Sequence, residues 1–178
     1  MQLPIGLHEV IDRLAEEGNR LCGRGQFAEA IEVFRKGLDI LPKPVDQWEA
    51  GLWFVAAIGD TQFLAKDYRN AADSFRDALL YGGIGNAFIH KRRGQTLYEL
   101  GERKEAANEL LRALLLDGEQ IFNQEGDAKY FKFVTSVAKP PAGRTSWKGW
   151  EGVEKSGPVY EWLMDSSAYE LRPKPRRE

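Results

Sequence analysis

Small and large apolar residues recur along the chain in a pattern that repeats three times. In each copy a Gly is followed twelve positions later by an Ala, four positions after that by a large apolar residue, and three positions later by a small one. The three copies are Gly18, Ala30, Phe34 and Gly37; Gly59, Ala71, Phe75 and Ala78; and Gly94, Ala106, Leu110 and Ala113. The pattern predicts three pairs of antiparallel helices.

The sizes of these residues have a physical reason. The Gly and Ala positions are expected where two helices of a pair cross closely, because a larger side chain would push them apart. The large residues are expected to fill the gap to the next pair. A single pair cannot bury its own apolar face, whereas stacked pairs bury a continuous one. Gly25 and Gly101 fall between the predicted helices, where a left-handed glycine ends a helix.

This spacing resembles the tetratricopeptide repeat (TPR). The resemblance covers about residues 11–120 and implies an all-α solenoid of three helical hairpins, at about 11–44, 52–85 and 87–120, that binds other proteins. The match departs from the family pattern in places. No Trp or Leu opens the first and third copies at the expected positions, and the closing Pro is present only as Pro42.

The distance from Gly18 to Gly59 exceeds the TPR period by about seven residues. We place the surplus at Val45–Gly51 and interpret it as an N-terminal extension of the helix that runs to Lys66. The alternative is an irregular loop after Pro44.

Residues 121–141 are expected to cap the open end of the third pair, as one kinked helix or two short ones, because the last unit of a solenoid would otherwise expose its apolar face. Pro140 and Pro141 stop this segment. The extension at 142–178 is rich in Gly, Pro and Trp, with a short helix expected at about 159–171 and a solvated basic end at 172–178. Its Trp147, Trp150 and Trp162 are interpreted as anchors on the cap, and the alternative is that this tail contacts a partner or gates the groove.

Composition excludes several classes of function. The net charge is −2, so bulk electrostatics does not favour nucleic-acid binding. No apolar run is long enough for a transmembrane helix, and the N-terminus does not resemble a signal peptide. The single Cys22 fits a reducing compartment, so we expect a cytoplasmic protein. The oligomeric state is left open.

Catalytic signals are weak. His8 and His90 are far apart, and no spacing typical of a metal site occurs. Gly82–Gly85 lacks the Lys and Ser or Thr of a phosphate-binding loop and is interpreted as a turn. Cys22 has no obvious His or Asp partner, so a small apolar role is favoured over a nucleophile. We therefore expect no enzyme activity, no cofactor and no metal.

In TPR stacks the leading helix of each pair lines a concave face, so the resemblance implies a set of partner-binding residues. The nine residues are Asp12, Asn19, Trp53, Asp60, Phe63, Phe88, Lys91, Gln95 and Tyr98. Rigid aromatic side chains with polar neighbours are typical of interface hot spots. The alternative for some of the four aromatic residues is a place in the core between helices.

Some TPR proteins grip the C-terminal carboxylate of heat-shock chaperones with a clamp of Lys, Asn, Asn, Lys and Arg. The matching positions here are Ala15, Asn19, Asp60, Lys91 and Gln95, of which two are kept. Asp60 would repel a carboxylate. We therefore reject the chaperone clamp.

A narrower resemblance is carried by residues 53–60 and 85–95, by Ile121-Phe122 and by Lys129-Tyr130-Phe131. These stretches are similar to bacterial TPR proteins that act as immunity partners of polymorphic or contact-delivered toxins. The resemblance implies a stoichiometric inhibitor that occludes a toxin's active site, and Asp12, Asp60 and Glu99 would suit a basic toxin. The alternative is an adaptor or secretion chaperone that holds an extended peptide in the groove.

Overall fold

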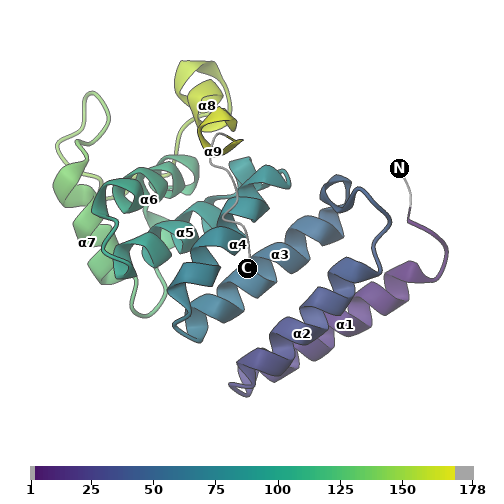
Figure 1. The fold of residues 1–178 in the computed structure, drawn as a ribbon. Coiled ribbons are helices and arrows are strands. Elements are labelled where there is room, and N and C mark those ends of the chain that lie inside the picture. The colour runs from purple at the N-terminus through teal and green to yellow at the C-terminus, as the bar shows by residue number, and fades with distance from the viewer. Residues whose placement is uncertain (1–2, 171–178) are drawn as a thin grey trace. The chain divides into compact units, whose positions relative to one another are not determined.

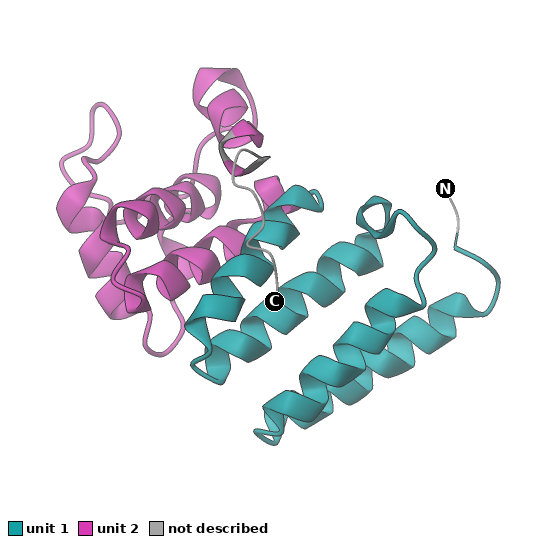
Figure 2. Cartoon of the chain, viewed as in Figure 1, with its two compact units in different colours: residues 1–82 teal, residues 83–178 magenta. Residues whose placement is uncertain are grey.

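The computed structural model describes residues 3–170, apart from the side chains of Ala168 and Glu170, and within this range all regular structure is helical. The basic end that the sequence predicts at 172–178 lies outside the described residues. The chain divides into two compact units, residues 1–82 and 83–178 (Figure 2). The predicted divisions at 120 and 141 fall inside the second unit.

The first unit consists of two pairs of consecutive helices. Its elements are α1 (Leu7–Gly23), α2 (Phe27–Asp39), the 3₁₀ turn η1 (Val45–Gln47), α3 (Glu49–Leu64) and α4 (Tyr68–Leu80). Each helix packs on the next, α1 on α2, α2 on α3 and α3 on α4 (Figure 1). The first two pairs of helices predicted from the repeated pattern are therefore present.

Phe34 of α2 shows why the pattern needs both a Gly and a large residue. A Cβ built on Gly18 of α1 would overlap the Phe34 ring, so only a glycine allows the two helices to cross here. On its other side the ring contacts Trp53 and Phe54 of α3, with ring centroids 5.7 and 6.3 Å apart. Phe34 thus packs at the crossing within its own pair and, as predicted, also fills the gap to the next pair.

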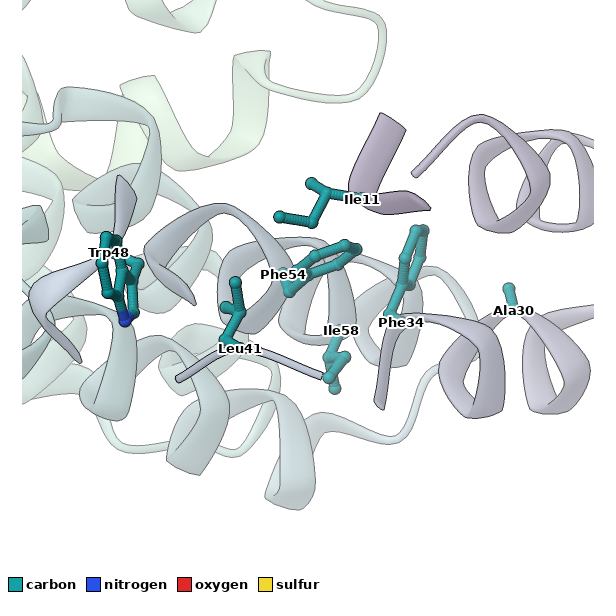
Figure 3. Packing of buried hydrophobic residues seen from close by; sticks show 7 residues of the cluster. All are labelled: Ile11, Ala30, Phe34, Leu41, Trp48, Phe54 and Ile58. Carbon is teal, nitrogen blue, oxygen red and sulfur yellow. The ribbon is translucent and has the colours of Figure 1, made fainter. Parts of the chain in front are cut away.

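The core of the first unit is a continuous apolar cluster contributed by α1, α2, α3 and the residues between α2 and α3 (Figure 3). Its fully or nearly buried members are Ile11, Ala30, Phe34, Leu41, Trp48, Phe54 and Ile58. Cys22 is half-buried and packs against this cluster, in agreement with the small apolar role expected for it.

The surplus residues between the first two pairs are only partly helical. α3 begins at Glu49, whereas Val45–Gln47 forms a separate 3₁₀ turn and Trp48 is extended, with φ −107° and ψ 132°. The predicted helical extension is therefore right for Glu49–Gly51 and wrong for the residues before it. The reason is Trp48: its ring is buried, and its indole Nε1 donates a hydrogen bond of 2.6 Å to the carbonyl of Pro42.

The second unit contains the third pair of helices and the segments that follow it. Its elements are η2 (Gly83–Gly85), α5 (Ala87–Glu99), α6 (Arg103–Asp117), η3 (Glu119–Phe122), α7 (Ala128–Val137), α8 (Gly157–Leu163) and α9 (Ser167–Glu170). α5 packs on α6, and a Cβ on Gly94 would lie 2.6 Å from Cγ of Leu110. The Gly82–Gly85 segment is a turn, as predicted, and Asn86 caps α5 by accepting hydrogen bonds from the backbone of Phe88 and Ile89.

η3 and α7 cover α6 where the sequence predicts a cap. The buried cluster that joins them comprises Leu110, Ala113, Leu114, Phe122, Tyr130, Val134 and Trp147. Of the helix predicted at about 159–171, residue 171 lies outside the described residues, and the described part is instead divided into α8 and α9. The side chain of Asp165 accepts a hydrogen bond from the Ser167 amide between them.

Two of the three Trp residues in the extension anchor it within this unit. Trp147 is buried, and its Nε1 donates to the carbonyl of Ala138 at 2.9 Å. Nε1 of Trp150 donates to the carbonyl of Leu114 at 3.0 Å. For these two residues the anchoring interpretation is confirmed, whereas Trp162 is 43% exposed.

Candidate binding surface

The nine predicted partner-binding residues divide between the two units. Asp12, Asn19, Trp53, Asp60 and Phe63 belong to the first unit, and Phe88, Lys91, Gln95 and Tyr98 to the second. That the nine residues line one groove remains a prediction.

A hollow of about 830 Å³ in the first unit brings together three of the predicted residues, Asp12, Asn19 and Trp53. It lies between α1 and the start of α3. The full lining is Leu3, His8, Ile11, Asp12, Ala15, Glu16, Asn19, Gln47, Trp48, Glu49, Ala50 and Trp53. Ile11 and Trp48 also belong to the core cluster of Figure 3, so the core itself forms part of the wall.

Trp53 is the large exposed aromatic side chain of this hollow. It is 40% exposed, and its ring meets those of Phe34 and Phe54 edge-on, with centroids 5.7 and 5.2 Å apart. Both partners are almost completely buried. The ring of Trp53 is therefore held in place by the core while one part of it remains open to a ligand.

The same hollow carries three exposed carboxylates. Asp12 and Glu16 lie four positions apart on α1, and Glu49 lies four positions before Trp53 on α3, so each pair shares one face of its helix. Among the described residues that line the hollow there is no Lys or Arg. The wall is thus aromatic and acidic.

Asp60 and Phe63, the other two predicted residues of the first unit, do not line the hollow. Both are half-buried, and the ring of Phe63 packs against Tyr68 with centroids 5.6 Å apart. Sequence position alone does not separate them from Trp53, because all three occupy the same helix.

Lys91 and Gln95 are buried, contrary to the expectation that they line an open face. Nζ of Lys91 donates to Oδ2 of Asp127 and to Oε1 of Gln124, both at 3.0 Å, and Nε2 of Gln95 donates to Oδ1 of Asp127 at 2.6 Å. The physical reason is the segment between η3 and α7, which folds over this face of α5. The two side chains hold that segment, so we leave them out of the candidate surface.

The aromatic residues predicted in the second unit are half-buried. Tyr98 packs against Tyr130 and Phe133 of α7, with centroids 5.3 and 5.0 Å apart, and the Arg103 guanidinium lies 3.5 Å from its ring centroid. For Tyr98 the alternative of an interhelical position is the one observed. Phe88 lines a smaller hollow of about 390 Å³ in the same unit.

A buried charge cluster between α5, α6 and α9 was not predicted from the sequence. Nδ1 of His90 lies 2.7 Å from Oε2 of Glu109, and its Nε2 lies 2.8 Å from the carbonyl oxygen of Ile84. Nε of Arg93 lies 3.5 Å from the other carboxylate oxygen of Glu109. Both ring nitrogens of His90 therefore face acceptors, an arrangement that the doubly protonated ring satisfies.

The surroundings of Glu109 and Tyr169 in this cluster shift the pKa of these two groups. Burial raises the pKa of Glu109, but hydrogen bonds and charges from His90 and Arg93 outweigh burial, and the net pKa is lowered. Burial and the nearby Glu109 carboxylate raise the pKa of Tyr169. The Glu109 carboxylate is thus buried and paired with the buried Arg93 guanidinium inside this unit. No motif marks it, since its residues come from three separate segments.

In the part of the chain that the structure describes, no three or more His, Cys, Asp or Glu side chains gather in a way that would hold a metal ion. None of the helices described combines the length and the apolar character needed to span a bilayer.

Comparison with known proteins adds no family to this picture. No protein-family model matches the chain, and neither does any curated protein.

Proposed function

We propose that this protein is a binding module for another protein and that the hollow beside Trp53 carries the contact. The observation behind the proposal is a large aromatic ring that is fixed by the core and 40% exposed at the wall of an 830 Å³ hollow. Fixed Trp side chains are strongly enriched among residues that dominate binding free energy, because they bury much area and lose little conformational entropy.

We also propose that the three helix pairs form a TPR-type solenoid. The turns α1–α2, α3–α4 and α5–α6 each contain three residues, and the middle residue of each is left-handed: Gly25, Lys66 and Gly101, with φ of 74°, 61° and 81°. In every pair the Gly of the first helix also meets the large residue of the second. Equal turns and equal crossings support three copies of one structural unit.

For the partner we propose a toxin domain that this protein binds stoichiometrically and inhibits. The support is the sequence resemblance to immunity proteins at residues 52–141, together with the acidic wall of the hollow, which complements a basic surface. An inhibitor of this kind needs fast association and slow dissociation, both of which opposite charges and a fixed aromatic anchor favour.

The test is a pull-down from the native cell extract with three baits: the wild-type chain, Trp53→Ala, and Trp162→Ala as a control for loss of an exposed Trp. We expect one stoichiometric partner with the wild type and the control, and loss of it with Trp53→Ala. Expression of that partner alone should arrest growth, and co-expression of this protein should restore it.

Other outcomes would contradict parts of the proposal. Several weakly bound clients that share an extended motif, without toxicity, would replace the inhibitor with an adaptor. If Trp53→Ala recovered as much of the partner as the wild type, the hollow would not be the binding site. Failure of the wild type to retain any partner would refute protein binding.

A further inference from the structure

The side chains that line the hollow of the first unit also indicate which kind of ligand it binds. Its wall combines the carboxylates of Asp12, Glu16 and Glu49 with the exposed ring of Trp53. We propose that this hollow binds a basic segment of the partner protein, with an Arg or Lys side chain placed between the carboxylates and the Trp53 ring. This inference rests on the proposed function.

The charges of the lining favour a cation. Three carboxylates in one hollow raise the local concentration of cations and repel phosphate or carboxylate groups, and no Lys or Arg lines this part of the described chain to neutralise them. A nucleic-acid strand or an acidic peptide would therefore be disfavoured. His8 is the other titratable side chain in the lining, and it is exposed.

The Trp53 ring adds a preference for a guanidinium or ammonium group over a bare metal ion. A cation placed over the face of a Trp is attracted by the ring quadrupole, and a guanidinium in addition forms two parallel hydrogen bonds with one carboxylate. The carboxylates themselves do not form a metal-binding group within the described residues. The combination matches a basic side chain carried by a polypeptide.

The apolar residues of the lining would contact the uncharged part of such a segment. Ile11, Ala15, Ala50 and Trp48 provide surface for the methylene stem of Arg or Lys and for neighbouring apolar residues. Trp48 cannot turn aside easily, because its indole is hydrogen-bonded to Pro42 at 2.6 Å. The hollow is thus preformed, which lowers the entropic cost of binding.

The experiment uses the full chain and three labelled peptides of equal length in which Leu alternates with Arg, Gln or Glu. Fluorescence anisotropy should show the Arg peptide binding about tenfold or more tightly than the Gln peptide, with the Glu peptide weakest, and the preference should shrink at high salt. Equal binding of the Arg and Gln peptides would overturn the proposal.

Two variants with the same change in net charge locate the site. Asp12→Asn/Glu16→Gln/Glu49→Gln removes the carboxylates of the hollow, and Glu17→Gln/Glu29→Gln/Asp39→Asn removes three exposed carboxylates of the same unit that do not line it. We expect the first variant to lose the preference for Arg and the second to keep it. Equal loss in both would show that only net charge matters and would overturn the proposal.

A measurement on the wild-type chain does not depend on these variants folding. With ¹⁵N-labelled tryptophan, the chain gives five indole signals. The Arg peptide should shift the signal of Trp53 and leave those of Trp147 and Trp150 unchanged. Absence of a shift at Trp53 would refute the site.

A pull-down distinguishes failure of the basic-segment proposal from failure of the proposed function. If Asp12→Asn/Glu16→Gln/Glu49→Gln and the wild type recover the same stoichiometric partner, the protein binds a partner but not through a basic segment in the hollow. That result would refute this inference and support the proposed function. If the wild type recovers no partner, the proposed function falls, and the peptide titration alone then decides the preference of the hollow.

Discussion

The ring of Phe34 lies against the backbone of Gly18, so that a Cβ added to the glycine would overlap ring atoms. Phe34 is 1% exposed and is held from the other side by Trp53 and Phe54. The ring has little room to move away from α1. The close crossing of α1 and α2 therefore depends on the absence of a side chain at position 18.

Gly18→Ala should destabilise the protein by about 1–3 kcal/mol, the usual cost of overpacking a core. Gly23→Ala is the matched control, since Gly23 lies in the same helix and a Cβ there meets nothing within 4 Å. Alanine at position 23 should leave stability unchanged or raise it by about 0.5–1 kcal/mol, because Ala favours helix. Urea denaturation of the two variants checks this, and equal effects would contradict the crossing argument.

Asp127→Ala should destabilise the second unit strongly. The substitution leaves the ammonium of Lys91, which is 1% exposed, without its carboxylate partner. Removing one member of a buried ion pair typically costs about 3–5 kcal/mol. Thermal denaturation measures the loss, with Glu125→Ala as the control for an exposed carboxylate in the same loop.

A double variant tests the origin of that loss. Lys91→Met combined with Asp127→Ala removes both charges and should recover a large part of the stability lost by Asp127→Ala alone. No recovery would mean that Asp127 acts mainly through its hydrogen bond with Gln95.

Protonation of Glu109 at acid pH should lower the stability of the protein. Its pKa is lowered in the folded state from an ordinary value of 4.5, so its stabilising contribution is complete above that value and is lost as the pH falls through the lower, folded-state pKa. The groups that face it are His90, Arg93 and Tyr169.

The comparison of wild type with Glu109→Gln isolates this effect. Between neutral pH and about pH 3, the wild type should lose more unfolding free energy than the variant, and the two curves should converge. Urea denaturation across the pH range gives both curves. Parallel curves would show that Glu109 is not the responsible carboxyl.

Arg112 should hold helix α8 on α6. Its guanidinium donates to the carbonyl of Leu163 at 3.0 Å and lies 4.2 Å from the centroid of the Trp162 ring. Arg112→Gln should speed proteolytic cleavage in residues 139–166 severalfold by raising the population of the opened state. Lys104→Gln, an exposed substitution on the same helix, should not, and equal cleavage rates would contradict the assignment.

The repeated pattern predicted the helix pairs because it depends on local chemistry. Two neighbouring helices can cross closely only where the residue at the crossing is small, as at Gly18, Gly59 and Gly94. A three-residue turn needs a left-handed residue, as at Gly25 and Gly101. These residues alone therefore indicate where helices begin, end and meet. The same reasoning failed at Val45–Trp48, where a 3₁₀ turn is followed by an extended Trp48 whose ring is buried.

What lies over each helix face was decided only by the tertiary structure. Lys91 occupies a position that an open stack would expose, but Asp127, thirty-six residues later, folds over it and forms a buried pair. His90 and Glu109 meet Tyr169 in the same way, from segments that share no motif. The period of a helix determines which residues share a face, whereas the burial of that face depends on contacts between segments distant in sequence. The sequence therefore determined the helix pairs, and the tertiary structure decided that Trp53 lies open beside three carboxylates while Lys91 and Gln95 are enclosed.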